Sequence, residues 1–152
     1  MTDLQPLTML LDLHERKRDA AIVEHQRVRR ASEAAAAQAA QLLAYRREYE
    51  QRWQTQFRQA AQMEVLRSYQ SFMERLTHAV DQQARIAEHA HAQLEHALVA
   101  LRDTELRCAS VRKLIERRTH EQRLSTNRLE QKRSDESASR AAWDHPNAPR
   151  RH

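Results

Sequence analysis

The chain has 152 residues, with no glycine and only three prolines. Turns that require a positive φ angle normally use glycine, so a sheet or a loop-rich fold is hard to build from this sequence. Ala, Glu, Lys, Leu and Arg together make up 80 residues, just over half of the chain, which is typical of a long helix or coiled coil. Only seven residues are aromatic and 24 are alanine, so the apolar core is too thin to enclose a substrate. The composition predicts an all-α protein that is not an enzyme.

The charge and cysteine content narrow the class further. The net charge is +5, from 26 basic and 21 acidic residues, which favours acidic partners but is too mixed to indicate nucleic acid. The single cysteine, Cys108, excludes an internal disulfide and a cysteine-built zinc site. No apolar run approaches the roughly 20 residues that cross a bilayer, and the first residues lack the basic region of a secretory signal. We therefore expect a cytoplasmic protein with no transmembrane segment.

The first expected helix spans about residues 5–57 and carries the weaker of two heptad patterns. Ten of its fifteen heptad positions are apolar, and the alanines between 34 and 40 favour helix and let a partner helix approach closely. The fifteen positions are Leu4, Leu7, Leu11, His14, Arg18, Ala21, His25, Val28, Ser32, Ala35, Ala39, Leu42, Arg46, Tyr49 and Trp53.

The second expected helix spans about residues 65–143, and thirteen of its fifteen heptad positions are apolar. Residues spaced alternately by three and four lie on one side of a helix, which is stable when another helix covers it. The fifteen positions are Leu66, Tyr69, Met73, Leu76, Val80, Gln83, Ala87, Ala90, Leu94, Ala97, Leu101, Thr104, Cys108, Val111 and Ile115.

The heptad register fails between the two helices, and we expect a reversal at about residues 58–64. Two helices joined by a short loop pack antiparallel, which covers both apolar sides within one chain. The alternative is one continuous helix that dimerises along its length. The hairpin predicts an all-α antiparallel coiled coil forming a single domain, 1–152. At about 1.5 Å per residue, residue 4 lies opposite about residue 118, so the C-terminal helix overhangs. The prolines near the end predict a disordered tail over 144–152.

The charge of the second helix is concentrated between residues 112 and 133. This window holds eight basic residues against three glutamates, a net +5 that equals the charge of the whole chain. It is expected at the open end of the hairpin. One interpretation is a solvated face with weak intrahelical ion pairs, each worth roughly 0.3–0.5 kcal/mol. The other is a basic end of the rod that enters an acidic or carbonyl-lined protein cavity.

A second apolar series lies one step around the same helix, at Phe72, Leu76, Ala79 and Gln83. One helix cannot direct both the heptad seam and this second series toward the same neighbouring helix, so Phe72 is expected to be partly exposed. Exposed apolar patches mark binding sites. The alternative is that the first helix is wide enough to cover Phe72.

The sequence gives little support for a metal site, a reactive cysteine, a phosphate-binding loop or nucleic-acid binding. His89 and His96 share a helix face, but His91 points away from both, so no metal site is expected. Cys108 is a small apolar residue of the heptad seam and has no ordered base beside it. There is no glycine-rich phosphate loop and no set of base-stacking aromatics. We expect no catalytic residue, no cofactor, no metal and no nucleic-acid partner.

Several segments resemble the family of the flagellar export protein FliJ. The stretch 67–76 followed by 79–83 is similar to the central segment of that family. The stretch 127–136 resembles its C-terminal pattern, in which Glu-Gln-Lys is followed by Asp-Glu. The stretches 10–13 and 45–49 also fit at the right spacing, so the resemblance spans roughly residues 4–143 without an insertion.

The resemblance implies a fold and a role. Proteins of this family are antiparallel two-helix coiled coils similar to the stalk subunit of rotary ATPases. They insert into the ring of the flagellar type III export ATPase and promote its assembly. They also contact the cytoplasmic region of the export-gate protein FlhA and escort empty export chaperones. The resemblance thus implies a non-catalytic coupler in the cytoplasm, associated peripherally with the inner face of the cell membrane at the export apparatus.

The resemblance also implies two binding surfaces. The export-gate surface would consist of Phe72, Leu76, Ala79 and Gln83. The ATPase contact would consist of Arg112, Arg118, Arg123, Arg128, Gln131, Lys132, Asp135 and Glu136. Two other interpretations remain open. One is the equivalent stalk of a virulence-type injectisome, although the pattern over 130–136 favours the flagellar protein. The other is an unrelated structural coiled coil or a basic helix that binds nucleic acid.

Overall fold

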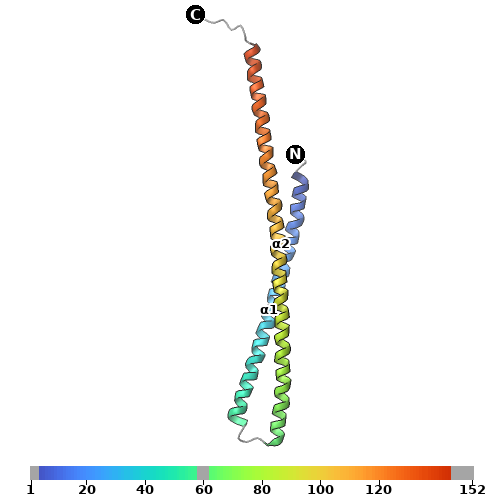
Figure 1. Cartoon of the computed structure of the whole chain (residues 1–152), viewed down its shortest axis with the longest axis vertical. Helices are drawn as coiled ribbons and strands as arrows, with labels where there is room; N and C mark the ends of the chain where they lie inside the picture. Colours follow the sequence, from blue (N-terminus) through green and yellow to red (C-terminus); the bar gives the residue numbers. More distant parts are fainter. Residues whose placement is uncertain (1–3, 58–61, 145–152) are drawn as a thin grey trace. The chain divides into compact units, whose positions relative to one another are not determined.

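The structure is a computed structural model that describes residues 4–57 and 62–144. It contains two long helices, α1 (Gln5–Arg52) and α2 (Met63–Asp144), and a π-helical turn, η2 (Trp53–Phe57), that follows α1. None of the described residues forms a strand. The two helices pack against each other as a helical hairpin, which confirms the predicted fold class (Figure 1).

The reversal lies between η2 and α2. Most of the predicted turn, residues 58–61, falls outside the described part of the chain. The description resumes at Gln62, whose carbonyl accepts a hydrogen bond from the Leu66 amide at 3.1 Å, and α2 begins at Met63. No described residue has a positive φ angle, in keeping with a chain without glycine. Of the predicted tail, Asp144 is the last residue of α2, and the rest lies outside the described residues.

The heptad residues form the contact between the helices. All fifteen predicted seam positions of the first series, from Leu4 through α1 to Trp53 of η2, are buried or half-buried, and so are all fifteen of α2. This includes the polar and charged members of the α1 series, such as His25 and Arg46, which are half-buried. The spacing therefore decides which residues face inward even where the residue type is unfavourable, because each heptad position lies on the same side of its helix.

The chain divides into two compact units, which are described separately. Unit 2 comprises Arg16–Glu105, where the two helices run side by side on either side of the reversal (Figure 1). Its most buried residues are Val28, Ser32 and Ala35 of α1 and Leu76 of α2. Three of the four are small or medium-sized, so the helices approach closely and the core between them is thin.

Unit 1 comprises Met1–Glu15 and Leu106–His152, of which residues 4–15 and 106–144 are described. The first turns of α1 lie beside α2 here, and α2 then continues past them (Figure 1). Cys108 is fully buried and Val111 is 8% exposed, which confirms Cys108 as a small apolar core residue. Every residue from 123 to 144 is exposed, so this part of α2 is the overhang that the sequence predicted.

Candidate protein-binding surfaces

The first candidate surface lies in unit 2, around Phe72. The Phe72 ring is half-buried, and its centroid lies 4.6 Å from that of Tyr49 on α1. Tyr49 in turn packs against Tyr45, with ring centroids 5.5 Å apart. The helix α1 thus covers one side of Phe72 and leaves the remainder of the ring accessible.

The other three predicted gate-binding residues differ in their surroundings. Leu76 is only 7% exposed and belongs to the seam between the helices. Ala79 and Gln83 are half-buried at the edge of the same seam. The structure therefore brings Phe72, Ala79 and Gln83 to one accessible side of α2, whereas the Leu76 side chain points into the packing between α1 and α2.

Gln83 forms one wall of an open groove between the helices. The other lining residues come from α1 and are Gln38, Gln41, Leu42 and Tyr45. The Gln83 side-chain oxygen is buried and accepts no hydrogen bond from the described residues.

A second pair of aromatic rings, Trp53 and Tyr69, lies next to Phe72. These rings stack at 4.0 Å with an interplanar angle of 10°, and they join η2 to the start of α2. Burial raises the pKa of the Tyr69 phenol above its ordinary value. The Glu50 carboxylate adds to this increase and the Arg46 guanidinium opposes it. The hollow beside them is lined by Tyr49, Trp53, Val65, Ser68, Tyr69 and Phe72.

Our sequence analysis missed this aromatic cluster. A signal for it was present, because six of the seven aromatic residues lie between positions 45 and 72. Aromatic pairs contribute roughly 0.5–1.5 kcal/mol beyond the area they bury, so such a concentration beside a reversal indicates a packed end of the hairpin. Tyr45, Tyr49 and Trp53 are spaced by four, which places them near one another along the helix. Tyr49 and Trp53 contact rings of α2, whereas Tyr45 is 44% exposed.

The second candidate surface is the exposed part of α2 in unit 1. All eight predicted ATPase-contact residues are exposed there. Arg112 donates a hydrogen bond to Glu15 of α1 at 3.1 Å, and Gln131 donates one to Asp135 at 3.1 Å. These residues are Arg112, Arg118, Arg123, Arg128, Gln131, Lys132, Asp135 and Glu136.

The cations of this surface have few internal partners. Among the described residues, no carboxylate lies within ion-pair distance of Arg118, Arg123 or Arg128. In unit 2, by contrast, several arginines are paired within α1, as in the Arg52–Glu48 bridge at 2.7 Å. The surplus of positive charge on α2 is therefore left free for an acidic partner.

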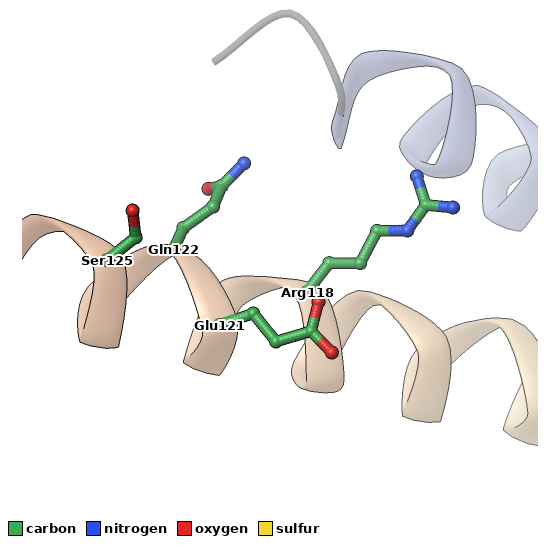
Figure 2. A pocket seen from close by; sticks show the side chains of 4 residues that line it. All are labelled: Arg118, Glu121, Gln122 and Ser125. Carbon is green, nitrogen blue, oxygen red and sulfur yellow. The ribbon is translucent and has the colours of Figure 1, made fainter.

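A shallow hollow lies on this part of α2, and its walls are polar. Its lining residues are Arg118, Glu121, Gln122 and Ser125, all from consecutive turns of one helix (Figure 2). Figure 2 shows the Arg118 guanidinium extending toward the first turns of α1. A hollow built from one exposed helix offers hydrogen-bonding and charged groups, but it does not enclose a small molecule as a catalytic cleft does.

The histidines of α2 do not assemble into a ligand set. Among residues 4–57 and 62–144, no group of three or more His, Cys, Asp or Glu side chains is placed to hold a metal ion. The His89 ring lies 3.1 Å from the Gln93 amide, and His91 lies 3.2 Å from the Glu95 carboxylate. Each contact is an ordinary i, i+4 pair on an exposed helix. None of the described helices is long and apolar enough to span a membrane.

Comparison with known proteins gives one family. No curated protein sequence and no solved structure matches the chain significantly. The family model described as "Flagellar FliJ protein" matches residues 3–147, nearly the whole chain. This family is a non-catalytic part of the flagellar protein export apparatus. The hairpin of two long helices and the matched range together show that the chain belongs to the flagellar FliJ protein family.

Proposed function

We propose that this protein is the stalk-like coupler of the flagellar type III export apparatus. In this role it binds and stimulates the export ATPase ring, contacts the cytoplasmic region of the export-gate protein FlhA, and escorts empty export chaperones. The observation that carries the proposal is the exposed end of α2, where no carboxylate of the described residues lies within ion-pair distance of Arg118, Arg123 or Arg128.

The ATPase contact is assigned to the exposed residues of α2 in unit 1. Every residue from 123 to 144 is exposed, so the whole circumference of the helix is available to a surrounding partner. Arg123 and Arg128 are five residues apart and therefore point in different directions. A central helix with cations on several sides suits a ring of subunits better than a single flat surface.

The gate contact is assigned to the accessible side of unit 2 that contains Phe72, Ala79 and Gln83. This side combines a partly exposed aromatic ring with a buried, unsatisfied amide oxygen. Aromatic anchors that are partly packed in the free protein lose little entropy on binding, which makes them effective interface residues.

The family membership supports the remaining parts of the proposal. We also assign to the protein chaperone escort and a location in the cytoplasm, at the inner face of the cell membrane, and its membership in a flagellar export family is consistent with both. The match to a flagellar family favours this role over the stalk of a virulence-type injectisome.

The proposal is tested by ATP hydrolysis and ring formation of the same organism's flagellar export ATPase, with and without this protein. The charge reversal Arg123→Glu with Arg128→Glu should lower the apparent affinity for the ATPase by about tenfold or more at low salt. The difference should shrink as ionic strength rises, because the Debye length falls to about 8 Å at physiological salt.

A matched control is available in unit 2. Arg47→Glu with Arg85→Glu makes the same change in net charge at exposed positions, and we expect at most a twofold effect. Equal losses from the two double variants would indicate a non-specific charge effect and would move the contact away from the end of α2. No stimulation by the folded wild-type protein would refute the stalk role.

A further inference from the structure

The first turns of α1 cover part of α2 in unit 1, and this cover is thin. Residues 4–15 contribute four seam positions, and all of them are only half-buried: Leu4, Leu7, Leu11 and His14. The three buried residues of α1 all lie further along the helix, in unit 2. The leucines of the first turns therefore keep part of their side chains in water while the helices are in contact, so separating them from α2 exposes little additional surface of α1.

The remaining apolar side chains of this segment do not strengthen the contact. Met9 is 67% exposed and Leu13 is 47% exposed. At 100° per residue, both point about 160° away from Leu11 around the helix, on the side opposite to the seam. Part of the apolar content of residues 4–15 is thus turned away from α2, and it contributes nothing that would hold the two helices together.

The side of α2 beneath this segment is covered more completely than the segment itself. Cys108 is fully buried, Val111 is 8% exposed and Ile115 is half-buried. These three residues are seam positions of unit 1, the unit to which residues 4–15 also belong. The contact therefore hides an apolar side of α2 beneath a segment whose own residues are all half-buried or exposed.

The charges at the start of α1 oppose a tight contact. The N-terminal end of a helix carries a positive partial charge, and the first turn of α1 contains no acidic residue. The Arg118 guanidinium of α2 extends toward these turns (Figure 2), so charges of the same sign face each other. The Glu15–Arg112 pair, at 3.1 Å, holds the other end of the segment. Both of its side chains are partly exposed, so solvent and salt weaken this attraction.

We infer that residues 4–15 form a displaceable cover, which opens and closes over Cys108, Val111 and Ile115 while the helices of unit 2 stay paired. In the open state the uncovered part of α2 lengthens from residues 123–144 to about residues 108–144, and it gains an apolar side. The cover therefore sets how much of α2 is available at its exposed end. The inference does not depend on the identity of the proposed partners.

The test uses Cys108 as a reporter, because it is the chain's only cysteine and is fully buried when the cover is closed. The full-length protein is labelled with iodoacetamide at several urea concentrations below the unfolding transition, and the labelled fraction is measured by mass spectrometry. Global unfolding allows a rate equal to that of the urea-unfolded protein multiplied by the unfolded fraction from circular dichroism. Cys108 should react at least tenfold faster than this limit without urea. The rate should depend only weakly on urea, since local opening exposes little surface.

Two variants show where the chain opens. Cys108→Ser combined with Ser32→Cys moves the thiol to a seam position of unit 2 that is 8% exposed, at almost unchanged side-chain volume. Its labelling should follow global unfolding, with the full dependence on urea. Cys108→Ser combined with Val111→Cys places the thiol one turn further along the covered side of α2, and it should react as Cys108 does.

Charge substitutions should shift the opening in opposite directions. Glu15→Gln removes the ion pair and should speed labelling of Cys108 by about twofold to fivefold. Arg118→Glu places a carboxylate beside the first turns of α1 and should slow it by a similar factor. The matched control is Arg140→Glu, which makes the same charge change at an exposed position further along α2 and should leave the rate unchanged.

The outcomes decide between local and global opening. If the thiols at positions 108 and 111 react no faster than global unfolding allows, with the same urea dependence as the thiol at position 32, the cover does not open by itself and the inference is refuted. If all three thiols react fast, the whole hairpin opens and residues 4–15 are not a separate element. If Arg118→Glu speeds the labelling of Cys108, the proposed repulsion at the start of α1 is wrong.

Discussion

The helix α2 is used in two ways along its length. In unit 2 it is covered on one side by α1, and its other sides expose mainly polar and charged residues, with Phe72 at the edge of the covered side. In unit 1, every residue from 123 to 144 is exposed, and these residues are predominantly polar and charged. The same type of heptad helix is therefore covered on one side in one region and exposes its full circumference in the other.

This difference has a physical basis in what stabilises each region. The helix in unit 2 is stabilised by burial of the seam and by aromatic packing next to the reversal. The exposed end of α2 has no such contribution and depends on helix propensity, to which its Arg, Ala, Leu and Glu residues contribute. Substitutions of seam residues should therefore affect stability in the first region, whereas substitutions at the exposed end of α2 should affect partner binding with little effect on stability.

The largest expected effect is the loss of a seam residue. Leu76→Ala removes a leucine that is 7% exposed and should lower the free energy of unfolding by about 2–4 kcal/mol, because the thin core cannot refill the space. Leu129→Ala, at a position 49% exposed, should cost less than about 0.5 kcal/mol. Urea unfolding followed by far-UV circular dichroism measures both. Similar losses at the two positions would remove the distinction between the regions.

A smaller effect on the free energy of unfolding is expected when either tryptophan is replaced by alanine. Trp53→Ala removes the ring stacked on Tyr69 and should cost about 1–2 kcal/mol, since Trp53 is only half-buried. Trp143 is 82% exposed, so Trp143→Ala should be nearly neutral. Tryptophan fluorescence of the two single-tryptophan proteins reports how buried each remaining tryptophan is. The proteins retaining Trp53 and Trp143 should show blue-shifted and solvent-exposed emission, respectively, and identical spectra would contradict the packing described here.

The smallest effect should come from the ion pair between the helices in unit 1. Glu15 and Arg112 lie 3.1 Å apart with partly exposed side chains, and such pairs contribute roughly 0.2–1 kcal/mol. A double-mutant cycle with Glu15→Gln and Arg112→Gln should give a coupling in this range that decreases in high salt. A coupling of several kcal/mol would mean that the contact of α1 with α2 in unit 1 is electrostatic instead of apolar.

Much of the fold could be predicted because it depends on local periodicity. The thirty seam positions, fifteen on each helix, were read from spacing alone, and the structure places all of them in the interface or at its edge. The exposed state of the predicted ATPase-contact residues from Arg123 to Glu136 follows from chain geometry, because α2 is longer than α1 and no helix of the described part of the chain covers this end.

The arrangement around Phe72 could not be predicted in the same way. Leu76 belongs to the seam series and to the second apolar series, so spacing left its direction open. The structure turns it inward, because α1 approaches α2 on that side. The contact of Phe72 with Tyr49 and the shared groove of Tyr45 with Gln83 depend on how the two helices are aligned past the reversal. Residues 58–61 carry no turn signal that would set that alignment.

The sequence by itself determined that the chain is a helical hairpin, which side of each helix is covered, and where the positive charge is concentrated. These properties follow from residue type and from a repeat of seven, both of which act within one helix. Only the tertiary structure decided which residues of α1 stand beside Phe72 of α2, and which arginines are left without a carboxylate among the described residues. Those facts depend on contacts between residues that are far apart in the chain, and a helical repeat does not specify the alignment of one helix against another.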